Sequence, residues 1–355
     1  MKTVATIELE PGMVTGEDAV DYNGYVVVHA DKTLTSIDIK RLNRHQIMAV
    51  VIKERVDFAT THYERVRVSD EFQRFEEQYD KYFAVYKTLL MNYVLYQKPF
   101  RMEDLMKVYE NIVPYAATPE LLLDYLYNMT PSEDDMTHRH CLNSALIAGV
   151  FGKWLELSDT DLDILIQTGF VYDIGKLRIP DKILWKTGKL DDHERNLLRK
   201  HPKMGYDMVS RLAVNVHIPL ATLQHHERND GSGYPDNLKA DAIDPFAKYI
   251  AIVDTYEAMS SPRVYRESMH PFQIIANYEQ NRGYERYDAQ ALRTILTNLA
   301  NTQMGLKVRL SGERIGEIVY INEQDLTHPT VKLLDYAKGN LMNTAQAGLE
   351  VEAIL

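Results

Sequence analysis

This 355-residue chain has only one cysteine, no long apolar run and no excess of basic charge. The single cysteine, Cys141, excludes an internal disulfide framework and fits a reducing compartment. No stretch reaches the ~18 consecutive apolar residues of a membrane span, and no signal-peptide pattern opens the chain, so we expect a cytoplasmic protein without membrane contact. The formal net charge of −11 argues against a nucleic-acid polymer as partner, because clustered Lys and Arg hold phosphate backbones.

Proline and glycine are also too few, at 13 and 17 residues, for a disordered chain, and the length predicts two to three domains. Turn and strand signals predict a small β-rich N-terminal domain over residues 1–56. Residues 57–128 have a helical pattern, typical of a connector that could also pair two chains as a homodimer. Residues 129–298 are predicted to be all-α, and residues 299–355 to form a small subdomain around a β-hairpin. The expected fold class is therefore mainly α.

Helix caps support the all-α prediction. A capping residue precedes each expected helix, in the pairs Ser132 with Asp135, Ser158 with Asp161, and Asp191 with Glu194, and in Asp244 before Pro245.

Two of these helices carry an aspartate on the face that should be buried. After Ser158, apolar residues recur at helical spacing and the next member of the series is Asp173; Asp254 falls on an apolar face in the same way. An ionised carboxylate is too unfavourable to bury alone, so each aspartate needs a cation nearby. A structural salt bridge or cap and a metal site remain alternatives for either residue taken singly.

Four histidines of the same segment favour the metal. His140 opens a predicted amphipathic helix, His201 precedes a proline at a helix junction, and His225 and His226 lie near the end of a helix that Gly231 should terminate. A lone histidine at such a place is usually packed or exposed. Together with the two aspartates, they make a mixed nitrogen and oxygen ligand set suited to Fe, Mn or Zn.

The segment from His225 to Pro235, HHERNDGSGYP, permits two interpretations. It could be a helix end followed by an ordinary turn, since Asp-Gly and Gly-x-Gly are common in loops. It could also be a flexible loop that brings the Tyr234 hydroxyl toward a substrate at the neighbouring metal site.

HHERNDGSGYP, YDIGKLRIP (172–180) and HPKMG (201–205) closely resemble the HD-GYP family of cyclic di-GMP phosphodiesterases, which belongs to the HD superfamily. The resemblance implies an all-α HD-domain bundle over residues 129–298 and a centre of two divalent ions, Fe or Mn. It assigns metal binding to His140, Asp173, His201, His225, His226 and Asp254, with Asp173 bridging. It further implies a catalytic role for Asp173 and Lys176, and contacts to the nucleotide for Tyr234, Arg263 and Arg266.

Tyr172 departs from the family, which has the histidine of its His-Asp pair at this position. Tyr172 could be an unusual metal ligand, a bulky side chain that fills a vacated ligand position, or a packed aromatic residue. Met136 stands where some members have a glutamate for a third ion, so we expect no trinuclear centre.

The resemblance leads to a functional hypothesis, a metal-dependent phosphodiesterase that hydrolyses cyclic di-GMP to pGpG, GMP or both. Because of Tyr172, the alternative is a degenerate module that binds cyclic di-GMP and signals without cleaving it. Hydrolysis of another phosphoester is a third option, which the GYP loop disfavours.

Overall fold

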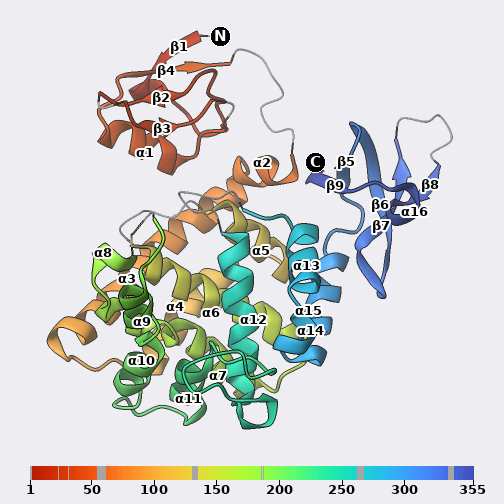
Figure 1. The fold of residues 1–355 in the computed structure, drawn as a ribbon. Helices are drawn as coiled ribbons and strands as arrows, with labels where there is room; N and C mark the ends of the chain where they lie inside the picture. The colour runs from red at the N-terminus through yellow and green to blue at the C-terminus, as the bar shows by residue number, and fades with distance from the viewer. Residues whose placement is uncertain are drawn as a thin grey trace.

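The computed structural model describes residues 2–22, 24–30, 32–53, 61–129, 135–184, 186, 188–261, 268–334 and 340–355. Figure 1 shows three parts: a small N-terminal unit, a large helical bundle and a C-terminal sheet beside the bundle. The mainly α fold class is confirmed. Within the described ranges, no helix is both long and apolar enough to cross a membrane.

The N-terminal unit contains two antiparallel strand pairs and one helix around a hydrophobic core of its own. Its elements are β1 (Lys2–Ala5), η1 (Thr6–Glu8), β2 (Ala19–Val20), β3 (Val26–Val28), α1 (Ser36–Arg44) and β4 (Ala49–Ile52). A hydrogen bond of 2.7 Å from Ser36 Oγ to Glu76 Oε2 joins the unit to the bundle.

The next helices share the hydrophobic core of the bundle. They are α2 (His62–Arg67), α3 (Asp70–Tyr96), α4 (Met102–Ile112), η2 (Val113–Tyr115) and α5 (Pro119–Asn128). Tyr79, Tyr86 and Tyr93 lie on one buried face of α3. Tyr86 donates to the Phe170 carbonyl and Tyr79 to Asn143 Oδ1, both at 2.6 Å. This face of α3 is thus used within the chain, while the predicted domain boundaries and dimer remain predictions.

The bundle continues with α6 (Met136–Trp154), α7 (Asp159–Val171), η4 (Ile174–Arg178), α8 (Asp181–Leu184), α9 (Asp192–Leu198), α10 (His201–Val209), α11 (His217–Gln224), η5 (Ala240–Ala242), α12 (Pro245–Ser260), α13 (Pro271–Gln280), α14 (Gly283–Arg286) and α15 (Ala289–Asn301). The caps at Ser158, Asp191 and Asp244 are confirmed, because each side chain accepts a backbone N–H of its helix. The predicted cap at Ser132 lies outside the described residues.

Two predictions about the bundle are wrong in detail. Helix α6 is buried on nearly all sides from His138 to Gly152, so it is the central helix of the bundle rather than an amphipathic one. Helix α11 already ends at Gln224, with His225 as its C-cap, instead of running on to Gly231. The sequence could not reveal either point, because both depend on which helices surround these segments.

The C-terminal part is larger than the predicted hairpin. The hairpin of β5 (Lys307–Leu310) and β6 (Arg314–Asn322) is present, but it belongs to an antiparallel five-stranded sheet in the order β8-β7-β6-β5-β9. The other elements are β7 (Asp325–Leu333), β8 (Leu341–Asn343), α16 (Thr344–Ala347) and β9 (Val351–Ile354). Pro329 lies inside β7, where proline normally argues against a central strand, and the β6–β7 register is irregular there.

Candidate metal centre

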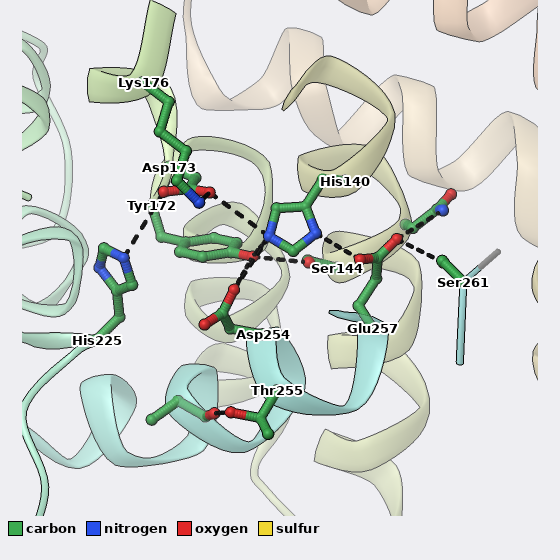
Figure 2. Close-up of polar contacts among 12 residues, drawn as sticks. His140, Ser144, Tyr172, Asp173, Lys176, His225, Asp254, Thr255, Glu257 and Ser261 are labelled. Carbon is green, nitrogen blue, oxygen red and sulfur yellow. Dashed lines mark hydrogen bonds and ion pairs between the residues drawn. The ribbon is translucent and has the colours of Figure 1, made fainter. Parts of the chain in front are cut away.

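Five segments that are far apart in the sequence meet inside the bundle. Figure 2 shows His140, Asp173, His225 and Asp254 from this set. The candidate ligands come from α6, the turn between α7 and η4, the start of α10, the end of α11 and the middle of α12. They form two groups, and within each group the ligand atoms lie within 4.8 Å of one another. The first group is His201, His225 and His226, and the second is His140, Asp173 and Asp254. The structure thus brings together all six predicted ligands.

In the first group, the Nε2 atoms of His201 and His225 face each other with lone pairs, and neither atom carries a proton for a hydrogen bond between them. His201 Nδ1 donates to the Leu198 carbonyl at 2.7 Å, and His225 Nδ1 donates to the Thr222 carbonyl at 2.8 Å. A carbonyl only accepts, so in the neutral rings both Nε2 atoms are unprotonated, yet they lie 3.3 Å apart. Asp173 Oδ1 lies 3.1 Å from His201 Nε2 and 3.7 Å from His225 Nε2.

Asp173 Oδ1 is fully buried and accepts no hydrogen bond from the described residues. Three electron-rich atoms facing one another need a cation, and the carbonyl bonds behind the two rings are the usual support of metal-binding histidines. The residues therefore fit a bound metal ion.

The close approach of two segments creates this arrangement. Asp173 precedes η4, and Gly175 in η4 packs so tightly on α10 that an added Cβ would lie 2.0 Å from the His201 carbonyl oxygen. Only glycine permits that contact, which brings the Asp173 carboxylate to the His201 ring.

Burial keeps these histidines ready to bind a metal. Desolvation lowers the pKa of His225 to about 4, although Asp173 opposes the shift, and it also lowers the pKa of His226 well below its usual value. Neutral imidazole is the form that ligates metals.

The second group is built around His140. Its Nε2 lies 3.0 Å from Asp254 Oδ1 and 3.5 Å from Asp173 Oδ2. Asp173 therefore faces the first group with one oxygen and the second group with the other, the arrangement of a bridging carboxylate. Burial alone would lower the pKa of His140, but Glu257 and Asp254 outweigh it and raise the pKa to about 9.

Lys176 contacts Asp173 Oδ2 from one turn further along η4. Burial alone would lower the pKa of its ammonium group, but Asp173 and Asp254 outweigh that effect and raise it. Lys176 is therefore a charged donor directly beside the ligand groups.

Tyr172 places its hydroxyl among the ligand atoms of the second group. The Oη atom lies 2.6 Å from His140 Nε2 and 3.0 Å from Ser144 Oγ, and it donates to Asp254 Oδ1 at 3.1 Å (Figure 2). Burial, reinforced by Asp254 and Asp173, raises the pKa of the phenol well above its usual value. The hydroxyl makes polar contacts, which disfavours the packed-aromatic interpretation and leaves the other two.

Glu257 is a functional candidate that the sequence indicated only weakly. It lies three residues after Asp254 on α12, and its Oε2 accepts from His140 Nδ1 at 2.5 Å. Asn143 Nδ2 and Ser261 Oγ donate to its Oε1 at 3.1 and 2.7 Å. Glu257 therefore fixes the orientation of the His140 ring.

We expect Glu257→Gln to weaken metal binding by the second group by about 10–100-fold, since the neutral amide supports His140 less well. Titration of the metal-free variant with Mn²⁺ measures the effect. Glu352→Gln, which changes an exposed glutamate of strand β9 outside the cavity wall, is the control and should bind the ion as the unchanged protein does. Equal affinity in both variants would contradict the role of Glu257.

A cavity of about 390 Å³ opens beside the ligand groups. Its wall contains His140, Asp173, His226, Asp254 and Glu257 from the centre, the basic residues Arg139, Lys176 and Lys186, and an apolar set that includes Met129, Met136, Ile183, Leu184, Leu190 and Leu198. Apolar walls with a few polar groups are typical of small-molecule sites. The predicted nucleotide contacts Arg263 and Arg266 lie outside the described residues.

The Tyr234 ring stacks on His226, one of the candidate ligands. Its ring lies 4.6 Å from the His226 ring at an interplanar angle of 27°, and the Arg199 guanidinium covers it at 4.5 Å. Behind it, Glu227 is buried and accepts the backbone N–H groups of Asp236 and Leu238 at 2.7 and 2.9 Å. These contacts position the loop next to the ligand groups, and the flexibility of the loop remains a prediction.

We expect Gly233→Ala to destabilise the protein by about 2–3 kcal/mol, because the added Cβ would lie 2.4 Å from the Glu227 Cα atom and overpack the loop. Urea unfolding measures the change. Gly188→Ala is the matched control, since nothing lies within 4 Å of its added Cβ. The explanation fails if both variants unfold at the same urea concentration.

Comparisons with known proteins agree with this geometry. The family model of the HD domain matches residues 121–291. The chain is 32% identical over 216 residues to the cyclic di-GMP phosphodiesterase PA4108 of Pseudomonas aeruginosa, covering 59% of this chain and 50% of that protein. It is 35% identical over 160 residues to the cyclic di-GMP phosphodiesterase response regulator RpfG of Xanthomonas campestris, covering 44% of this chain and 42% of that protein.

A third relative has a different substrate name. The 3'3'-cGAMP-specific phosphodiesterase 1 of Vibrio cholerae is 32% identical over 180 residues, covering 48% of this chain and 40% of that protein. The chain thus spans half or less of the length of these relatives.

A solved structure supports the fold. Bd1817, a HDG"Y"P protein from Bdellovibrio bacteriovorus, matches with a TM-score of 0.53 and 14% identity, covering 84% of this chain and 99% of that one. These matches identify residues 121–291 as an HD domain that is similar to the HD domains of proteins named as cyclic di-GMP phosphodiesterases, in line with the resemblance to the HD-GYP family.

Proposed function

We propose that this protein is a metal-dependent phosphodiesterase that hydrolyses cyclic di-GMP. The observation that carries the proposal is the convergence of His201 Nε2, His225 Nε2 and the unpartnered Asp173 Oδ1, which lack any proton to share. Relatives named as cyclic di-GMP phosphodiesterases supply the substrate class.

The donor set supports two ion positions joined by Asp173. His201, His225 and His226 would hold one ion, and His140 and Asp254 the other. Mixed imidazole and carboxylate donors suit Fe or Mn. When bound, the ions supply Lewis acidity toward a phosphoryl oxygen and an activated water.

The protein's own side chains account for the remaining steps. Charged Lys176, held beside Asp173, offsets the negative charge that develops on the phosphoryl group. A nucleotide contact by Tyr234, whose ring stacks on His226 and lies beneath the Arg199 guanidinium, is a prediction from the family resemblance. Nucleotide binding by Arg263 and Arg266 remains a prediction from the family resemblance.

The second candidate function is a receptor that binds cyclic di-GMP without cleaving it. The hydroxyl of Tyr172 among the ligands of the second group favours it, because a protonated phenol offers that ion no lone pair as strong as an imidazole nitrogen. A centre with one ion would still bind an anionic ligand. A homodimer and a cytoplasmic location likewise remain predictions.

A single set of measurements tests the proposal. Protein purified with Fe or Mn is expected to convert cyclic di-GMP to pGpG or GMP, to lose this activity with a chelator, and to regain it when the metal is returned. Calorimetric titration measures binding on the same sample. Tight binding without any product would replace the phosphodiesterase with the receptor, especially if Tyr172→His then cleaved the nucleotide.

A further inference from the structure

Arg139 lies in the wall of the cavity, one residue before His140 in α6. Its guanidinium group lies 4.4 Å from the centre of the Phe83 ring and 5.5 Å from that of Tyr79. Its Nη2 atom donates to Asp80 Oδ1 at 3.2 Å. Helix α3 therefore holds the guanidinium on one side by two aromatic faces and one carboxylate.

Two further nitrogens of Arg139 find no hydrogen-bond acceptor in the part of the chain that the structure describes. Nε and Nη1 are both buried, and no hydrogen bond joins either of them to a described residue. Arginine carries five N–H donors in a planar fork, and leaving charged donors unpaired is unfavourable. Packing between α3 and α6 explains the stack and the bond to Asp80, but not the unused donors, which an acceptor from a ligand would satisfy.

The charges of the cavity wall suggest the nature of that acceptor. Asp173, Asp254 and Glu257 belong to the metal centre, whereas Arg139 belongs to neither ligand group. A cyclic dinucleotide carries two phosphodiesters, and only one of them can be cleaved at the ions at a time. The second phosphodiester needs a counter-charge in the same cavity.

Building on the proposed function, we propose that Arg139 binds the phosphodiester of cyclic di-GMP that is not being cleaved, and so selects for cyclic dinucleotides over simple diesters. Guanidinium and phosphate form strong charge-assisted hydrogen bonds. Arg139 already forms part of the cavity wall, and because Nε and Nη1 are buried, the contact requires its side chain to turn toward the cavity, without a change in the path of α6. The residue acts in binding and takes no part in the bond-breaking step.

The test compares two substrates in the metal-loaded full chain. Arg139→Met keeps the length of the side chain and removes the charge. We expect it to raise KM for cyclic di-GMP, and Kd by calorimetry, by about 10–100-fold. With bis(p-nitrophenyl) phosphate, which has a single phosphodiester, kcat/KM and the metal content should stay within about twofold of the unchanged protein.

Arg293→Met is the matched control, since Arg293 also stacks on a tyrosine, at 5.2 Å from the Tyr284 ring, but lies outside the cavity. It should leave both substrates unaffected. If Arg139→Met does not fold, Arg139→Gln carries the same comparison with an uncharged side chain that can still form hydrogen bonds.

Two outcomes would overturn the role of Arg139 alone: unchanged binding of cyclic di-GMP, or an equal loss with both substrates. The first removes the contact, and the second assigns Arg139 to the stability of the metal centre. Failure of the proposed function looks different, because the unchanged protein would then neither bind nor cleave cyclic di-GMP while it still cleaved the small diester.

Discussion

Asp173→Asn is expected to abolish metal binding and to lower kcat/KM for cyclic di-GMP by about 10³-fold or more. Asp173 faces both ligand groups, with Oδ1 toward His201 and Oδ2 toward His140. An amide offers one oxygen and no negative charge, so it cannot bridge two cations. Metal analysis of the purified variant and a nucleotide assay measure the two effects.

The same substitution leaves the Lys176 ammonium without its carboxylate, and losing one partner of a buried pair costs about 3–5 kcal/mol. Thermal unfolding must therefore accompany the assay. Asp207→Asn is the control, because Asp207 forms an exposed pair with Lys203 at 3.2 Å and should retain activity and stability. A stable Asp173→Asn protein that keeps its metal would refute the assignment of this site.

Tyr172→His is expected to increase the occupancy of the second ion position, and to raise kcat/KM for cyclic di-GMP by about tenfold or more. The Tyr172 hydroxyl now lies between His140 and Asp254 and donates a proton there. An imidazole at this position would replace the donor with a lone pair directed at the second ion. Metal analysis and steady-state kinetics on the two proteins give both numbers.

Tyr172→Phe separates the two remaining interpretations of this residue. It keeps the ring and removes the oxygen. If the hydroxyl only fills the ligand position, as we expect, the metal content of this variant equals that of the unchanged protein. A drop in metal content would identify Tyr172 as a ligand, and the interpretation of a filled position would then be wrong.

Much of the candidate centre could be predicted because its signals are local. Asp173 and Asp254 stand out from helical spacing alone, and the motifs around His201 and Tyr234 are short and continuous. The capping pairs of α7 and α9 involve residues three positions apart, so the sequence also predicts where those helices begin.

Other features depend on neighbours that the sequence does not reveal. The predicted amphipathic helix around His140 is buried on nearly all sides, because α3, α5, α7, α12 and α15 pack around it. The predicted hairpin is part of a five-stranded sheet. The sequence did not indicate the other strands, because β7 contains a proline and β9 pairs with β5 across a long gap in the chain. The roles of Glu257 and Arg139 likewise arise from contacts with distant segments.

The sequence by itself determined which donors are available: a set of imidazole and carboxylate side chains, a tyrosine where the family has a histidine, and the helices that carry them. Only the tertiary structure decided that His201 and His225 turn their unprotonated nitrogens toward Asp173, and that the Tyr172 hydroxyl enters the second ligand group. The physical reason is the distance along the chain over which each kind of interaction acts. Helix periodicity and capping are fixed within a few residues, whereas the convergence of segments more than 100 residues apart depends on how the faces of many helices pack together.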